Sequence, residues 1–269
     1  MRFWCSAQGV AWTWTWQPYV GVWVMVLALG MAYARLVRGT TDGWPAPGSW
    51  RTWSFAAGLL ALWVALDWPV GALAAGYLAS LHMAQFLLVG LVGPALLLLG
   101  VPEAAWEAMG RRARLVAVLR RVTHPLAAFL VFNLVILLTH WPLVVDGLMG
   151  SQAGSFLIDM LWILGGTVMW WPVIAPIPER SRFGYPLKMA YLIAITITTT
   201  IPFLYLTFTS LPVYATYELA PPIAGITKRE DQRLAGLLMK LGGAVVLWTG
   251  ITVLFFQWYR REEGSIAGG

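Results

Sequence analysis

The chain has 269 residues, of which 59% are hydrophobic and only 11% are charged. Soluble domains carry about 25% charged residues, so this composition excludes an ordinary soluble protein. The formal charge of +6 does not indicate a nucleic-acid-binding protein, because the basic residues lie between apolar stretches, as they do in membrane-protein loops. The single cysteine, Cys5, excludes an internal disulfide, and we expect it to be an incidental residue at a short exposed terminus.

Apolar stretches close to the ~20 residues that a helix needs to cross a bilayer recur along the whole chain. Because lipid offers no partners to backbone polar groups, each stretch should be a helix. We therefore predict an all-α integral membrane protein with one domain, 1–269, and seven transmembrane helices. The predicted spans are about 19–37, 53–70, 78–100, 125–143, 155–174, 188–210 and 236–258. The arginine-rich segment 103–122 is too charged to span and is predicted to be an amphipathic helix on the membrane surface.

The basic residues predict the orientation. Of the 18 lysines and arginines, 13 fall at one membrane face and five at the other, and the richer face should be cytoplasmic. The N-terminus would then lie outside and the C-terminus inside. The 13 residues are Arg35, Arg38, Arg51, Arg111, Arg112, Arg114, Arg120, Arg121, Arg180, Arg182, Lys188, Arg260 and Arg261; the five are Arg2, Lys228, Arg229, Arg233 and Lys240.

Polar residues from separate parts of the chain converge on the predicted outer face. They are His82 and Gln85 at the start of the third span, His140 at the end of the fourth, Ser155 and Asp159 in the fifth, Asp67 after the second, and Asp231 and Gln232 before the seventh. Polar side chains within spans usually face the bundle interior or a water-filled cavity. We expect His82 to approach His140 and Asp159 in the folded bundle.

The chemistry of this cluster suits copper. Imidazole nitrogens together with thioethers, supplied here by Met83, Met149 and Met160, favour Cu(I). The candidate metal ligands are therefore His82, Met83, His140 and Asp159, with Gln85, Asp231 and Gln232 as further members of the polar cluster. The alternative for each residue alone is structural, since polar groups near a membrane surface also bond to neighbouring helices and methionines pack in cores.

Five short motifs in order resemble those of the seven-helix bacterial CtaG family of cytochrome c oxidase assembly factors, which is distinct from the single-span copper chaperone of the same name. The resemblance covers roughly 16–258. It is carried by His82, Met83 and Gln85 with Pro94 and Leu99-Gly100; by His140 and Pro142; by Gly166, Trp170, Trp171 and Pro172; by Tyr214 and Tyr217; and by Asp231, Gln232 and Gly236.

The chain also departs from the family pattern. Phe86 stands where the family usually has a second histidine, Ser155 and Asp159 stand at a usual histidine pair, and Thr139 stands at a usual tryptophan. If the family histidines bind copper, this chain keeps a reduced set.

The resemblance implies a non-enzymatic factor of a bacterial inner membrane that holds or hands over copper while a haem–copper oxidase is built. None of the common nucleophile or phosphate-binding motifs is present in the sequence. The alternative is a structural accessory subunit of a respiratory or other redox membrane complex, with the metal function lost. A small-solute transporter fits less well, because the charged residues lie at span ends rather than at the membrane centre.

Overall fold

The computed structural model describes residues 2–38, 49–177, 183–223 and 225–267, and every regular element of this part of the chain is a helix. Arg180 and Arg182, two of the residues used to predict the orientation, lie outside the described residues. The first helices are α1 (Val20–Arg38), α2 (Trp50–Leu66), α3 (Val70–Gly76), α4 (Ala79–Phe86), the π-helix η1 (Leu87–Val92), α5 (Gly93–Gly100), α6 (Glu103–Gly110) and α7 (Ala113–Val122).

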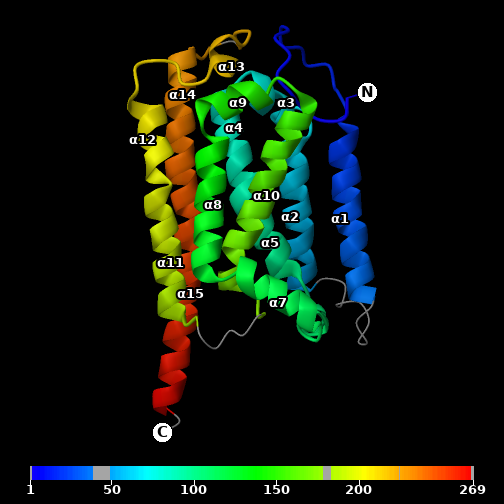
Figure 1. Ribbon diagram of the computed structural model, residues 1–269, viewed down its shortest axis with the longest axis vertical. Coiled ribbons are helices and arrows are strands. Elements are labelled where there is room, and N and C mark those ends of the chain that lie inside the picture. The colour runs from blue at the N-terminus through cyan, green and yellow to red at the C-terminus, as the bar shows by residue number, and fades with distance from the viewer. Residues whose placement is uncertain (1, 39–48, 178–182, 224, 268–269) are drawn as a thin grey trace.

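The remaining helices follow in the second half of the chain. They are α8 (Pro125–Thr139), α9 (Pro142–Leu148), α10 (Gln152–Ile174), α11 (Tyr185–Thr198), α12 (Thr200–Phe208), α13 (Ala215–Glu218), α14 (Lys228–Leu237), the π-helix η3 (Leu238–Gly242) and α15 (Gly243–Ala267). The long helices run side by side as one bundle, with α1 at one edge and the pair α11–α12 with α15 at the other (Figure 1).

Five helical segments are long and apolar enough to cross a membrane: Val20–Arg38, Ala79–Gly100, Gln152–Ile174, Tyr185–Phe208 and Lys228–Gly264. Two bent pairs, α2 with α3 (48°) and α7 with α8 (60°), raise the number to at most seven. The helical membrane fold is thus confirmed, while the count of seven stays a prediction. The two termini lie at opposite ends of the bundle (Figure 1), as an odd number of crossings requires.

Local chemistry explains the helix ends. Ser49 and Ser151 cap α2 and α10 by accepting hydrogen bonds from backbone N–H groups, and Thr227 with Glu230 forms a capping box at the start of α14. Proline occupies the first turn of α8, α9 and α11, where its missing N–H leaves no hydrogen bond unmade. The predicted fourth span, 125–143, is therefore two helices, because Pro142 begins α9 just after α8 ends.

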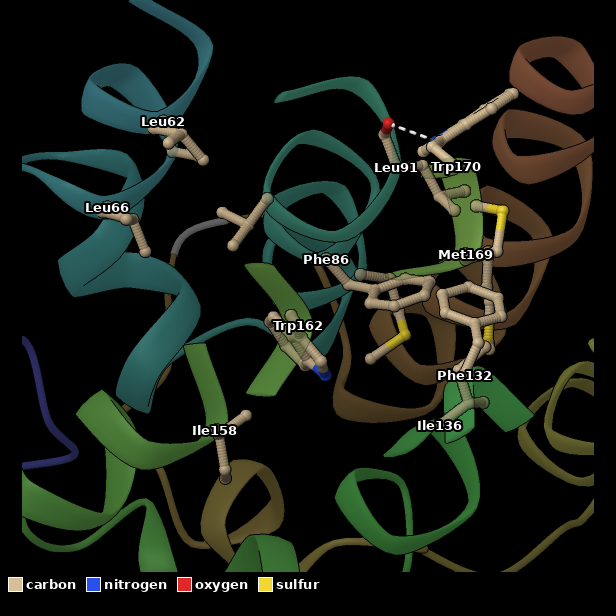
Figure 2. Close-up of a cluster of buried hydrophobic side chains, with 14 of the residues drawn as sticks. Leu62, Leu66, Phe86, Leu91, Phe132, Ile136, Ile158, Trp162, Met169 and Trp170 are labelled. Carbon is tan, nitrogen blue, oxygen red and sulfur yellow. Dashed lines mark hydrogen bonds between the residues drawn. The ribbon is translucent and has the colours of Figure 1, made fainter. Parts of the chain in front are cut away.

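The core lies between α2, α4–α5, α8 and α10. Large apolar side chains from these helices, including Leu62, Phe86, Phe132 and Trp162, are at most 2% exposed and pack against one another (Figure 2). The indole of Trp170 on α10 donates to the carbonyl oxygen of Leu91 in η1 at 2.9 Å, the dashed line in Figure 2. This contact ties the fifth predicted span to the π-helical turn of the third.

Residues 103–122 form the helices α6 and α7 at the end of the bundle remote from the N-terminal segment (Figure 1). No residue of α7 is buried, and Val118 and Val122 are exposed. An amphipathic helix with an uncovered apolar side is typical of the membrane interface.

The N-terminal segment, residues 2–19, packs onto the bundle instead of extending into solvent. Trp4 and Cys5 are 0% and 2% exposed, and the Cys5 thiol donates to the carbonyl oxygen of Leu66 at 3.2 Å. The backbone N–H groups of Val20 and Gly21 donate hydrogen bonds to the carbonyl oxygens of Arg2 and Phe3, so the two ends of the segment lie side by side. The expectation of an exposed, incidental Cys5 is therefore wrong, because this short segment folds back over the ends of α2 and α10.

The buried environment predicts that Cys5 is unreactive in the folded protein. Burial raises the pKa of the Cys5 thiol, so that the reactive thiolate is scarce as well as inaccessible. We expect a maleimide reagent to label Cys5 only after denaturation, as measured by mass spectrometry of the intact chain. Rapid and complete labelling of the native protein in detergent would contradict the packed N-terminal segment.

Candidate functional site

The polar residues predicted to converge do so at the end of the bundle that carries the N-terminal segment. α4, α10 and α14 bring His82, Asp159 and Asp231 to this end, and His140 follows the end of α8. The side chains of all four residues are at most 7% exposed, and Gln85 and Gln232 are buried as well. The prediction that one end of the bundle gathers the polar residues of several spans therefore agrees with the structure.

His82 lies in the interior, where neither imidazole nitrogen makes a well-formed hydrogen bond, although the Gln85 side chain one turn further along interacts with the ring. Its ring lies against the Trp162 indole on α10, with ring centroids 4.9 Å apart, and against Tyr217 on α13 at 5.7 Å. An imidazole that is 1% exposed normally has at least one bonded nitrogen. The ring is therefore held by packing, with its polar atoms available to a further group.

His140 is oriented by one bond and leaves its second nitrogen free. Its Nδ1 lies 2.9 Å from the carbonyl oxygen of Ile136, so Nδ1 carries the proton and donates it. The buried Nε2 then holds a lone pair with no partner. The ring contacts Phe86 at 5.2 Å and Trp162 at 6.2 Å between centroids, so both histidines lie on the same Trp162 indole.

Asp159 has a partner of its own in the N-terminal segment. Its carboxylate accepts a 2.7 Å hydrogen bond from the Trp4 indole, while the amide oxygen of Gln152 accepts from the backbone N–H groups of Phe3 and Trp4. Within the described residues, no three His, Cys, Asp or Glu side chains are grouped as a metal site would need. The structure thus places both histidines against the Trp162 indole, and the metal roles of His82, His140, Asp159 and the buried Met83 stay predictions.

Asp231 and Gln232 connect helices. The Asp231 carboxylate accepts hydrogen bonds from the backbone N–H groups of Ala79 and Ser80, at 2.7 and 3.1 Å, and from the Ser80 hydroxyl. Gln232 accepts from the backbone N–H of Val213 at 2.8 Å and donates to the carbonyl of Leu211. Asp231 therefore caps the start of α4 at Ala79, three residues before His82, which gives it a positioning role.

Sequence reasoning missed the side chains that cover this site. The hydroxyl of Tyr214 donates to the carbonyl of His140 at 3.0 Å, and that of Tyr217 donates to the carbonyl of Ala74 at 2.8 Å. Tyr214 and Tyr217 form the Tyr-x-x-Tyr motif of the sequence, but the motif was not assigned a role. The position of Trp4 could not be predicted, because nothing in the first residues indicates that the N-terminal segment packs against α10.

A pocket with a volume of about 370 Å³ lies at the same end of the bundle, lined by Ala79 and by residues from the segment 210–232. Tyr217 lines this pocket and also touches His82, so its ring separates the pocket from the imidazole. Leu211 and Tyr214 form further parts of the wall, and its charged residues are of both signs: Lys228, Arg229, Glu218 and Asp231.

The fold and the site together define an all-helical membrane protein with a buried, partly unpartnered histidine pair near one end of its bundle. The model of the cytochrome c oxidase caa3 assembly factor family matches residues 10–261. The chain belongs to this family, and the resemblance drawn from the five motifs is confirmed. No curated protein and no solved structure matches the chain.

Proposed function

We propose that this assembly factor holds copper between His82 and His140 at the outer face of a bacterial inner membrane and passes it to a haem–copper oxidase. The family supplies the connection to cytochrome c oxidase. The copper is cargo, and the protein acts by binding rather than by catalysis.

The observation that carries the proposal is the unpartnered Nε2 of His140, together with the buried His82, whose ring nitrogens make no well-formed hydrogen bond. A buried polar atom without a partner costs about 1–3 kcal/mol, so the folded chain retains an unfavourable arrangement that a bound group would relieve. Imidazole nitrogens suit copper, and the neighbouring Met83 adds a soft thioether.

The bond of His140 to Ile136 has the form expected of a metal ligand. Histidines that bind metals usually donate their other ring N–H to a carbonyl or carboxylate, which fixes the tautomer and directs the free nitrogen to the metal. The Nδ1–H of His140 makes such a bond, and Nε2 is the free atom. Tyr217 lines the pocket and contacts the His82 ring, so we propose that copper enters from this side.

Oxidase activity under copper limitation tests the proposal. His82→Ala and His140→Ala should lower haem–copper oxidase activity severalfold in cells that depend on this protein, and added copper should restore it. The matched control is His124→Ala, since the exposed His124 lies beside the start of α8, on another part of the chain. Full activity of both variants at low copper would contradict the copper role and favour the structural accessory subunit.

The proposed location requires the N-terminal segment and the histidines to face outward. Supporting this orientation, the five arginines of 111–121 lie at the opposite end of the bundle, together with Arg35 and Arg38 at the end of α1 (Figure 1). A reporter enzyme that works only in the cytoplasm should therefore be active when it is fused after the last residue. Activity of a periplasmic reporter at that position would overturn the orientation.

A further inference from the structure

Lys240 is a partly buried basic residue of the seventh predicted span, 236–258, where it had been counted only with the basic residues of the outer face. It belongs to the π-helix η3, within the continuous segment Lys228–Gly264. Its ammonium donates to the carbonyl oxygen of Thr196 at 3.0 Å and to the hydroxyl of Thr200 at 2.6 Å. Both threonines are close to the middle of the membrane-crossing segment Tyr185–Phe208.

The contact falls where two helices are irregular. α11 ends at Thr198 and α12 begins at Thr200, and Pro202 has no N–H for the preceding turn. The opposing η3 is a π-helix, a form that is frequent at functional sites. Lys240 binds across the break between α11 and α12. Among the described residues, its hydrogen-bond partners there are neutral oxygen atoms of Thr196 and Thr200.

No carboxylate pairs with Lys240 in the part of the chain that the structure describes, where the ion pairs are Arg51 with Glu103 and Arg111 with Glu107. An ionised side chain at the centre of a bilayer is costly and normally pairs with an opposite charge or lines a water-filled cavity. Lys240 is only partly buried, and neighbouring Leu241 on η3 and Ile201 on α12 are 62% and 71% exposed. Lys240 therefore borders the exposed apolar surface of η3 and α12.

We propose that the surface around Lys240, formed by η3 and α12, is a docking site for a transmembrane helix of a partner protein that carries an aspartate or glutamate near its middle. Charge complementarity selects this occupant, because a lipid headgroup cannot reach mid-span and a purely apolar helix would leave the ammonium without a counter-ion. The surface is distinct from the histidine pair and does not depend on copper binding.

Photo-crosslinking in native membranes tests the proposal. With p-benzoylphenylalanine at Leu241, irradiation should yield an adduct with a membrane protein, and mass spectrometry should place the adduct on a transmembrane segment with a central carboxylate. Lys240→Met should reduce the adduct about tenfold or more, because truncating one partner of a buried charge pair weakens binding strongly. Lys240→Arg should retain most of it.

Two controls separate the charge from local packing. Thr200→Val removes a bonded hydroxyl but keeps the ammonium, so it should keep the adduct. Photo-probe adducts at Leu134, on the lipid-facing side of α8, should not change with Lys240→Met. The proposal is overturned if no adduct forms, if its yield is the same in Lys240→Met, if Thr200→Val abolishes it equally, or if the captured segment has no carboxylate. A lower melting temperature of Lys240→Met with an undiminished adduct would also overturn it.

Discussion

Replacing Asp231 with alanine is expected to lower the free energy of unfolding by about 3–5 kcal/mol and to disturb the position of His82. The carboxylate is 1% exposed and accepts from the backbone N–H groups of Ala79 and Ser80 and from the Ser80 hydroxyl. Alanine would leave these donors buried without an acceptor. The start of α4 would lose its cap and its connection to α14, and the first turn of α4 leads directly to His82.

The melting temperature in detergent measures this effect. At roughly 2–4 °C for each kcal/mol in a chain of this size, the loss should be on the order of 10 °C. Asp231→Asn should be less harmful because it keeps one acceptor oxygen. The control is Glu230→Ala at the next position, which removes only the capping box with Thr227 and should cost about 1 kcal/mol. Equal melting temperatures for Asp231→Ala and Glu230→Ala would contradict the role of Asp231.

Gly166→Ala is expected to cost about 3 kcal/mol or more, because the added methyl group would meet backbone. A Cβ atom at Gly166 would lie 1.9 Å from the carbonyl oxygen of Gly90 and 2.8 Å from its carbonyl carbon. No rotamer change can relieve a backbone clash, so α10 would have to move away from η1. Trp162, which supports both histidines, lies one helical turn before Gly166 and would move with it.

The adjacent glycine supplies the matched control. A Cβ atom at Gly165 would lie 3.3 Å from a methyl group of Val135, which can shift by rotation of its side chain. Gly165→Ala should therefore stay within about 1 kcal/mol of the natural protein. Chemical denaturation of both variants provides the comparison, and a Gly166→Ala protein as stable as Gly165→Ala would contradict the close approach of α10 and η1.

The helices and their approximate ends could be predicted from the sequence because bilayer thickness fixes a length and lipid forbids unpaired backbone. The convergence of His82, His140 and Asp231 followed from counting spans, since antiparallel neighbours place alternate ends together. The bends could not be located in the same way. In the predicted span 53–70, Asp67 and Pro69 mark the end of α2, but they do not indicate that the chain resumes a helix at Val70 with a bend of 48°.

The details of the site depended on tertiary contacts that leave little trace in the sequence. Cys5 and Trp4 precede the first span and look like an exposed terminus, but Trp4 pairs with Asp159. Asp231 was grouped with the candidate metal cluster from its residue type, whereas its bonds to α4 show a helix cap. Lys240 lies inside the predicted seventh span, 236–258, and was counted with the outer-face basic residues, but its bonds to Thr196 and Thr200 of the neighbouring helices could not be predicted.

Copper K-edge X-ray absorption on the purified protein, loaded with one equivalent of Cu(I) and desalted, tests the central claim most directly. We predict that the natural chain retains the metal and shows scattering from imidazole ligands. His82→Ala and His140→Ala should each lose that signal, and His124→Ala should keep it. Failure of the natural protein to retain copper, or an imidazole signal that survives loss of both His82 and His140, would contradict the account.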